Sequence, residues 1–199
     1  MASKEAQTDF PIHPLLVKRW SPRAFQDKTI EKEKLQNIFE AARWSPSGSN
    51  QQPWRFIIGF KGDDTYERIF KILVEFNQIW TKTVPVLILS CGRKVMNENE
   101  AINPSYSYDV GQSVAYMTIQ AMQEGLYVHQ MGGFNKKQAV RLFKIPANYK
   151  PMSVIAIGYI NKHTILPVRM QKSELAVRSR MKAETWVYSG VFGERSDLF

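Results

Sequence analysis

Residues 43–54 read RWSPSGSNQQPW, a stretch that concentrates hydroxyl, amide and proline side chains. The hydroxyl and amide groups belong to Ser45, Ser47, Ser49, Asn50, Gln51 and Gln52. The prolines restrict the backbone, and the other residues add N–H groups that can donate hydrogen bonds. A buried helix or strand would not need so many polar groups. We therefore expect a loop that binds a polar small molecule rich in hydrogen-bond acceptors.

The length of 199 residues fits a single domain, 1–199, in which 1–9 form a flexible N-terminus. A chain of this size can bury about 70% of its unfolded surface without disulfides or metal. Hydrophobic residues make up 44% and charged residues 23%, which argues against disorder and against a membrane protein. The N-terminus lacks the apolar segment of a secretory signal, and the single cysteine, Cys91, cannot form an intramolecular disulfide. We therefore expect a cytoplasmic protein in which Cys91 is a small buried hydrophobe.

The formal net charge of +9 permits nucleic-acid binding, but the lysines and arginines are scattered along the chain. Anionic small ligands explain the excess of positive charge equally well. His13, His129 and His163 lie far apart and lack the short spacings of metal ligands. We expect no bound metal, no nucleic-acid partner and no membrane association.

Apolar periodicity and turn residues predict alternating helices and strands followed by a polar tail. The predicted helices cover 14–20, 30–44, 66–80, 109–124 and the region around 139–143. The predicted strands cover 55–60, 84–91, a short segment within 126–131, and 152–160. This order predicts a mixed sheet covered by helices, in an α/β or α+β fold.

The predicted helix at 109–124 is apolar over most of its circumference. Such a helix is either central in its domain or packed against a second subunit.

Arginines flank a serine in two further places, at Arg19–Ser21–Arg23 and at Arg178–Ser179–Arg180. Guanidinium groups bind phosphate oxygens in pairs of hydrogen bonds, and a serine between them can add its hydroxyl. Arginines exposed to solvent are the alternative interpretation, and for either pair alone it is the better one. Together with the amide-rich stretch, the two pairs favour a site for a phosphate-bearing ligand.

The chain carries neither a strand-GxGxxG-helix fingerprint nor a Walker motif, and no Ser-His-Asp or Cys-His arrangement can be assembled. We name no catalytic side chain. This pattern indicates a protein whose chemistry belongs to a bound cofactor.

Four segments together make the chain resemble the nitroreductase family of FMN-dependent oxidoreductases. They are RWSPRAF at 19–25, PSGSNQQPW at 46–54, MGGF at 131–134 and RSR at 178–180. The likeness runs from residue 13 to about residue 187. It implies an α+β fold with a central mixed β-sheet flanked by helices. It also implies an intertwined homodimer that binds two FMN molecules at its interface.

By this resemblance, Arg19, Ser21 and Arg23 approach the phosphate, the ribityl chain and the N1/O2 edge of the flavin. Arg178 and Arg180 complete the phosphate site. The whole set of expected FMN-binding residues is Arg19, Trp20, Ser21, Arg23, Pro46, Ser47, Asn50, Gln52, Gly132, Gly133, Arg178 and Arg180.

The resemblance assigns the remaining contacts to two other segments. Pro46, Ser47 and Asn50 would come from the partner subunit, with Gln52 nearby. The backbone N–H groups of the pair at 132–133 would approach the N5/O4 edge, where a side chain would obstruct hydride transfer.

The implied activity is transfer of a hydride from NAD(P)H through flavin N5 to an electron-poor small molecule, such as a nitroaromatic or a quinone. Two alternatives keep the flavin: a dedicated dehydrogenase or dehalogenase acting on one metabolite, and a flavin carrier. A basic nucleic-acid-binding module is a third alternative, and only the net charge supports it.

Overall fold

The computed structural model describes residues 4–199 and contains one four-stranded sheet. The strands are β1 (Trp54–Phe60), β2 (Val86–Arg93), β3 (Tyr127–Met131) and β4 (Tyr149–Gly158), in the order β1-β2-β4-β3. Neighbouring strands are antiparallel throughout, so the expectation of a mixed sheet is wrong. The fold class is α+β, as the sequence predicted.

The connection between β1 and β2 explains the antiparallel pairing. Phe60 at the end of β1 pairs with Val86 at the start of β2, so the chain returns to the end of the sheet that it left. A single crossover helix would carry it to the opposite end and produce a parallel pair. Two helices lie in this connection, where the sequence predicted one at 66–80.

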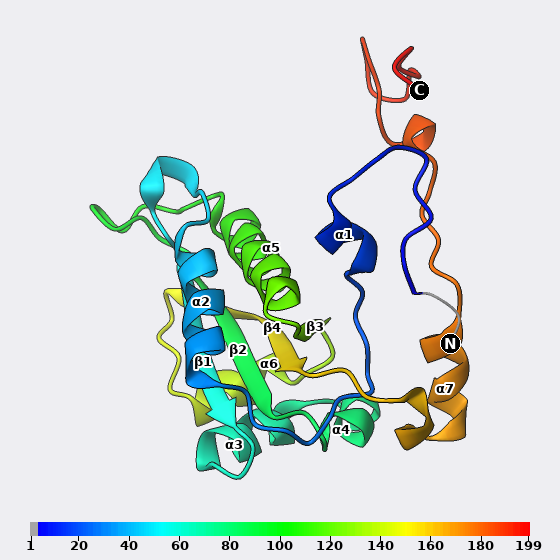
Figure 1. Ribbon diagram of the computed structural model, residues 1–199. Coiled ribbons are helices and arrows are strands. Elements are labelled where there is room, and N and C mark those ends of the chain that lie inside the picture. Colours follow the sequence, from blue (N-terminus) through cyan, green and yellow to red (C-terminus); the bar gives the residue numbers. More distant parts are fainter. Residues whose placement is uncertain (1–3) are drawn as a thin grey trace.

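Helices cover both faces of the sheet (Figure 1). On one face lie α2 (Lys32–Arg43) and α5 (Tyr106–Gln123), whose apolar side chains form one core cluster with the sheet. On the other lie α3 (Asp64–Ile72), α4 (Glu75–Thr81) and α6 (Lys136–Leu142). The sheet is therefore the middle layer of three.

Strand β2 supplies both layers of the core. Val86 and Ile88 belong to the cluster with α2 and α5, whereas Leu87 and Leu89 belong to the cluster on the opposite face. All four side chains are at most 1% exposed. This alternation follows from the two-residue period of a strand and confirms the prediction of a fully buried strand.

Helix α5 begins three residues earlier than predicted and ends beside Gly125, whose φ of +75° suits a glycine after a helix. Its inner face is buried against α2 and the sheet. Its outer face remains open, with Tyr108 71% and Tyr116 46% exposed. The helix is therefore not enclosed on all sides within this chain, so the first of the two interpretations, a helix central in its domain, holds only for its inner face.

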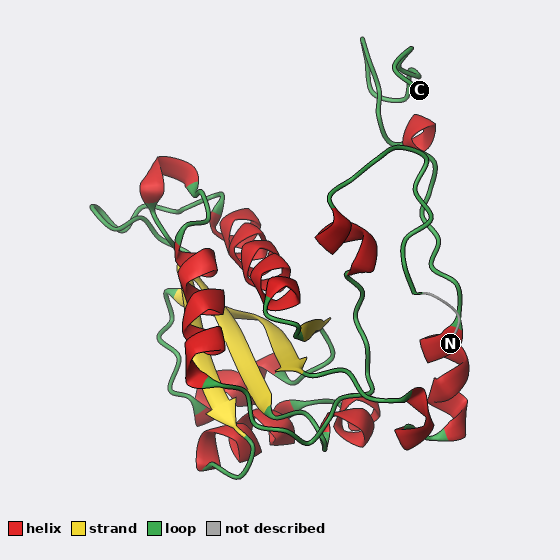
Figure 2. Ribbon diagram, viewed as in Figure 1, coloured by secondary structure: helices red, strands yellow, loops and turns green. Residues whose placement is uncertain are grey.

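The two ends of the chain run together outside the three layers (Figure 1). After β4, the chain forms a short turn of 3₁₀ helix (His163–Ile165), α7 (Val168–Leu175) and a further 3₁₀ turn (Ala183–Thr185). Most of the tail after α7 lacks regular structure (Figure 2). Beside it runs the N-terminal segment with α1 (Pro14–Lys18). Within residues 4–199, the helices are too short or too polar to cross a bilayer.

Candidate cofactor-binding site

The segment 19–24, which we call the arginine turn, is held from two sides. Glu174 of α7 accepts hydrogen bonds at Oε1 from the backbone N–H groups of Arg23, at 2.8 Å, and Ala24, at 3.1 Å. His129 of β3 lies with Nδ1 2.8 Å from the carbonyl oxygen of Pro22 and 3.1 Å from that of Ser21. The turn is therefore bonded both to the sheet and to α7, which together with the tail after it (168–199) we call the C-terminal arm.

The protonation state of His129 follows from its surroundings. Both partners of Nδ1 are carbonyl oxygens, so this nitrogen carries the proton. Burial lowers the pKa of His129 to about 4, although the hydrogen bond to Pro22 acts in the opposite direction. Its ring also lies against Trp80, with ring centroids 4.6 Å apart. Near pH 7 the imidazole is neutral and acts as a fixed hydrogen-bond donor.

The predicted arginines of both chain ends meet beside this turn. Burial lowers the pKa of Arg19, and the positive charges of Arg178 and Arg180 lower it further. The Arg178 guanidinium donates from Nη1 to the carbonyl oxygens of Lys4 and Val17, each at 2.9 Å. The ion pairs found within residues 4–199 involve other lysines and arginines. Three cations gathered in this way form an attractive site for an anion.

Three more predicted residues lie in the same turn. Ser21 is exposed, and its hydroxyl accepts a hydrogen bond from Arg19 Nη1 at 3.3 Å. The Trp20 ring packs edge-on against Tyr127, with centroids 6.4 Å apart. Arg23 is partly buried, and its Nε is a buried donor without a partner within the described residues. A ligand oxygen would satisfy that donor.

The segment 46–52, which we call the amide loop, has an unusual backbone. Ser49, Asn50 and Gln52 have φ angles of 48°, 53° and 45°, in the left-handed region that only glycine adopts freely. Ser47 Oγ accepts a hydrogen bond from Gln52 N at 3.0 Å. The Gln52 amide in turn donates to Asn50 Oδ1 at 3.0 Å. Strain of this kind persists only where the surrounding structure fixes the backbone, and it is concentrated at binding sites.

The amide loop is fixed by the segment that precedes α5 and by α5 itself. Gln51 is 4% exposed, and its amide donates to both Glu98 carboxylate oxygens at 3.0 Å. Its Oε1 accepts from Asn97 N at 2.7 Å. Asp109 Oδ2 accepts from Gly48 N at 3.3 Å. These contacts leave Pro46, Asn50 and Gln52 exposed to solvent.

A single chain does not bring the two groups of predicted residues together. Figure 1 places the 3₁₀ turn of the amide loop (Gly48–Asn50) beyond one end of α2. Helix α1 and the C-terminal arm lie on the other side of α5. The arginine turn and the amide loop of one chain are therefore separate.

The glycines at 132–133 follow β3 and differ from each other. A Cβ on Gly132 would meet no atom within 4 Å, so that position is open. A Cβ on Gly133 would lie 2.9 Å from Asn77 Nδ2 and 3.0 Å from Val74 Cγ2. The Gly133 carbonyl also accepts hydrogen bonds from Val74 N and Asn77 Nδ2, which explains why the predicted helix at 66–80 breaks at 73–74. The close approach at Gly133 is thus to its own chain.

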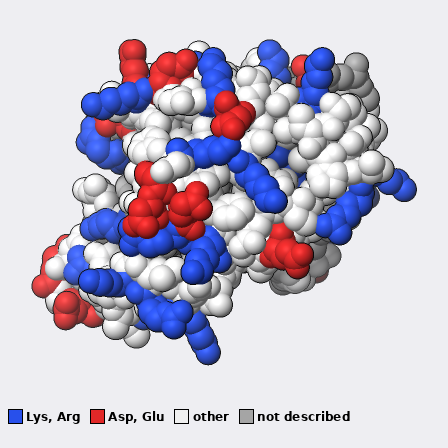
Figure 3. Space-filling view, turned by 90° about the horizontal axis from the view of Figure 1, so that it is seen from below, with Lys and Arg blue, Asp and Glu red and all other residues white. Residues whose placement is uncertain are grey.

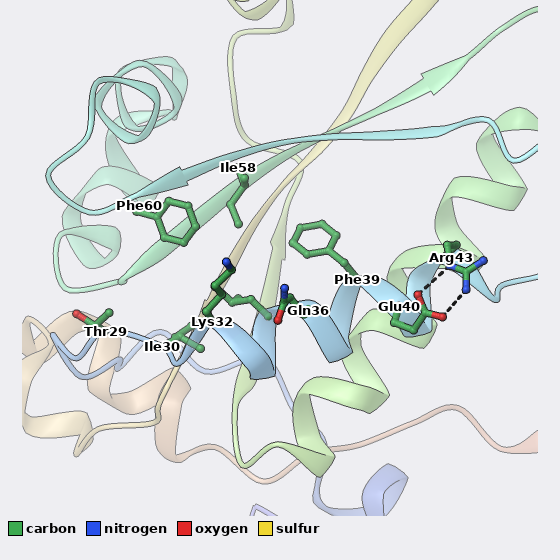
Figure 4. Close-up of a pocket in the computed structure, with 10 residues that line it drawn as sticks. Thr29, Ile30, Lys32, Gln36, Phe39, Glu40, Arg43, Ile58 and Phe60 are labelled. Carbon is green, nitrogen blue, oxygen red and sulfur yellow. Dashed lines mark hydrogen bonds and ion pairs between the residues drawn. The ribbon is translucent and has the colours of Figure 1, made fainter.

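A groove of about 640 Å³ lies elsewhere, between α2 and the edge strand β1. Figure 4 shows Phe39, Ile58 and Phe60 directed toward the space between the two elements. Two cations line it, Lys32 and Arg43, and Arg43 is already paired with Glu40. This mostly apolar groove contains none of the predicted FMN-binding residues.

The sequence predicted neither a metal site nor a nucleic-acid-binding surface. No group of three or more His, Cys, Asp or Glu side chains within residues 4–199 is placed to hold a metal ion. On the face seen in Figure 3, Lys and Arg side chains are interspersed with Asp and Glu. Cys91 is 3% exposed, which confirms that it is a small buried hydrophobe. Burial raises its pKa to about 11, which disfavours the reactive thiolate.

Sequence reasoning missed the side chains that hold the site in place. Glu174, Gln51 and Asp109 are buried and His129 is partly buried. The hydrogen-bond partners of all four lie far along the chain. His129 was assigned a structural role without its partners, and Gln51 was noted only as a polar loop residue. No local pattern distinguishes Glu174 or Asp109 from other acidic residues in helices.

Comparison with known proteins supports one family. The family model described as Nitroreductase family matches residues 16–80. A crystal structure of an oxidoreductase containing FMN superposes with a TM-score of 0.91 at 33% identity, covering 98% of this chain and 100% of that one. An FMN-dependent nitroreductase from Clostridium difficile gives a TM-score of 0.63 at 25% identity, covering 74% of this chain and 87% of that one.

A curated relative with a different activity also matches. Iodotyrosine deiodinase 1 of Sus scrofa is 28% identical over 186 residues, which cover 78% of this chain. The match spans 63% of the length of that deiodinase.

Proposed function

The chain belongs to the nitroreductase family, and on that premise we propose that it is an FMN-dependent oxidoreductase. It passes a hydride from NAD(P)H to small electron-poor acceptors such as nitroaromatics or quinones. The observation that carries this proposal is that Arg178 donates to the carbonyl oxygen of Val17, two residues before Arg19. Arg178 and Arg180 thereby lie close enough to Arg19 for their charges to lower its pKa, which burial also lowers. A phosphate monoester carries about −1.5 to −2 charges at pH 7 and suits such a cluster.

The donor set also fits the rest of the cofactor. Arg23 keeps a buried Nε without a protein partner within the described residues, and Glu174 fixes its backbone. When bound, FMN accepts a hydride from NAD(P)H and donates it to the acceptor. Arg23 provides a fixed positive charge that stabilises negative charge developing beside it. Gly132 leaves open space, so that donor and acceptor can approach.

A homodimer would complete the site, because the arginine turn and the amide loop of one chain lie apart. The outer face of α5 exposes Tyr108 and Tyr116. The C-terminal tail, which extends away from the sheet, exposes Trp186 at 60% and Phe192 at 94%. We assign the tail of a second copy to the apolar groove beside β1. The two chains would then be intertwined, and Pro46, Ser47 and Asn50 of one chain would face the arginines of the other.

Light scattering tests the dimer. The wild-type protein should have the mass of two chains, and Phe192→Asp should shift it toward one chain and weaken FMN binding. Lys71→Asp, an exposed change on α3, is the control and should leave the dimer intact. A wild-type monomer that binds FMN with full affinity would overturn the intertwined arrangement.

Flavin binding and reduction test the activity. The purified protein should bind FMN and rise in melting temperature when FMN is added, because a ligand of the folded state stabilises it. Rapid mixing with NADH or NADPH under anaerobic conditions should then bleach the flavin absorbance. If FMN neither raises the melting temperature nor binds, the proposal fails.

The deiodinase relative supports a second candidate, reductive dehalogenation of a halogenated aromatic metabolite. The same arginine turn would hold FMN, and only the acceptor would differ. Release of iodide from iodotyrosine by the chemically reduced protein, without bleaching by NADH or NADPH, would favour this activity. Rapid bleaching by a nicotinamide donor without halide release would exclude it. A protein that binds FMN without either reaction would be a flavin carrier.

A further inference from the structure

Glu174 joins the two segments that supply the arginines. Its carboxylate is 4% exposed, although it lies near the C-terminus of a mostly exposed helix. Oε1 accepts from the N–H groups of Arg23 and Ala24, 151 and 150 positions away. Four residues after Glu174, Arg178 donates to the carbonyl oxygens of Val17 and Lys4. The arm is therefore bonded to the arginine turn through Glu174, and to the N-terminal segment before the turn through Arg178.

One oxygen of the Glu174 carboxylate takes no part in these bonds. Oε2 is buried and has no hydrogen-bond partner within the described residues. No ion pair joins it to a cation in that part of the chain. Burial lowers the pKa of Lys4, and the nearby Glu174 charge opposes this shift. Burying a carboxylate with one unpaired oxygen destabilises the fold. The two bonds to the turn must offset this loss of free energy, which suggests that they have a role beyond stability.

We propose that Glu174 is a positioning residue that sets the arginine turn in register with Arg178 and Arg180, so that cations from both segments converge on the phosphate of FMN. The proposal rests on the proposed function, since it concerns the same site. Without the two N–H···O bonds, the turn and the arm would lose their direct link, whereas the bonds of Arg178 hold the arm only to residues before the turn. A phosphate would need arginines from both segments, whereas the flavin ring system would contact Arg23 of the turn and no arginine of the arm.

This difference makes riboflavin, which lacks the phosphate, the internal reference. In Glu174→Ala, the dissociation constant for FMN should rise about tenfold or more, whereas that for riboflavin should rise less, because riboflavin would be affected only through the loosened backbone of Arg23. The FMN-to-riboflavin ratio of the two dissociation constants should therefore rise. In Glu174→Gln, the side-chain carbonyl can still accept both N–H bonds, so the ratio should stay within about threefold of the wild-type value.

Asp63→Ala is the matched control. Asp63 also accepts two backbone N–H bonds through its carboxylate, from Tyr66 at 2.6 Å and Phe60 at 2.9 Å, but it caps α3 away from the site. Asp63→Ala should lower the melting temperature by about as much as Glu174→Ala does. It should leave the FMN-to-riboflavin ratio of dissociation constants unchanged. A purely structural role for Glu174 predicts that the two alanine variants behave alike.

The outcomes distinguish the positioning role of Glu174 from the proposed function. An unchanged ratio in Glu174→Ala, with the wild-type protein binding FMN, would overturn the positioning role and leave the proposed function standing. A Glu174→Gln variant as impaired as Glu174→Ala would also overturn it, because hydrogen-bond geometry would then not be the cause. Failure of the wild-type protein to bind FMN would overturn the proposed function and this role together. Should Glu174→Ala not fold, Glu174→Asp takes its place, since a carboxylate one methylene shorter cannot reach both N–H groups.

Discussion

The arginine turn and the amide loop present polar groups in different ways. The turn is bonded to Glu174, 151 positions away, and to His129, 107 positions away, and none of its residues has a left-handed backbone. The amide loop is bonded to Asn97 and Asp109, 46 and 61 positions away, and carries three left-handed residues that are not glycine. Long-range bonds therefore fix the turn, whereas nearer bonds hold the loop in a strained conformation.

This contrast predicts which changes should disrupt the structure of each region. The arginine turn depends on a few buried polar partners, so changes of charge or pH should affect it strongly. The amide loop already stores strain, so removing an anchor should destabilise it, and relieving the strain should stabilise it.

The largest effect should come from Arg23. Arg23→Ala removes a partly buried cation with an unpartnered Nε, and the dissociation constant for FMN should rise about 100-fold. Arg43→Ala is the comparison, because Arg43 is exposed and paired with Glu40 at the end of α2. It should leave FMN binding nearly unchanged. Fluorescence titration measures both, and equal losses would contradict the assignment of the cofactor to the turn.

Acid should loosen the arginine turn before it affects the amide loop. The pKa of His129 falls from 6.5 to about 4 on folding because of burial. Between these values the unfolded chain binds a proton that the folded chain does not, so this contribution is complete above pH 6.5 and is lost as the pH falls toward 4. By pH 4.5 the loss should reach about 2.5 kcal/mol.

Urea unfolding at pH 7 and pH 4.5 measures this loss. His129→Gln keeps a side-chain N–H near the Pro22 carbonyl but cannot titrate, so its stability should fall less between the two pH values. An equal fall in both proteins would show that His129 is not the sensitive group.

Gln51 and Gln52 are neighbours in the amide loop, and their alanine variants can be compared directly. Gln51→Ala removes a buried amide and leaves Glu98 and the Asn97 N–H without their partner, which should cost about 2 kcal/mol of unfolding free energy. Gln52→Ala, at an exposed position, should cost less than about 0.5 kcal/mol. FMN binding should show the reverse order if Gln52 is close to the ligand. Similar stability losses would contradict the anchoring role of Gln51.

The parts of the fold predicted from sequence are those with a local signal. The helical spacing of Leu35, Ile38 and Ala42 predicted α2, and these three residues are buried. The run at 84–91 predicted β2 because apolar side chains on both faces require burial on both faces. The direction of the strands had no such signal, because it depends on how the connections return across the sheet. The break at 73–74, within the connection from β1 to β2, rests on a contact with distant Gly133.

The candidate site could likewise be predicted only where its residues give a local signal. Arginines, serines and amides in short runs could be recognised because they lie close together in the sequence. Glu174 could not be recognised, because its importance arises only when α7 meets the arginine turn. The left-handed angles at Ser49, Asn50 and Gln52 could not be predicted either, since serine, asparagine and glutamine do not require them.

The smallest effect tests that hidden strain. Ser49 has φ 48° and ψ 30°, a conformation that costs a residue with a Cβ about 1–2 kcal/mol. Ser49→Gly removes this cost but adds entropy to the unfolded chain worth about 0.4–1 kcal/mol, so a net gain of about 0.5 kcal/mol is expected. Ser21→Gly, in the unstrained arginine turn, should instead destabilise the fold slightly. Chemical unfolding of both variants distinguishes the regions, because a loss of stability in Ser49→Gly would mean that the anchors at Asn97 and Asp109, rather than stored strain, determine how the loop responds.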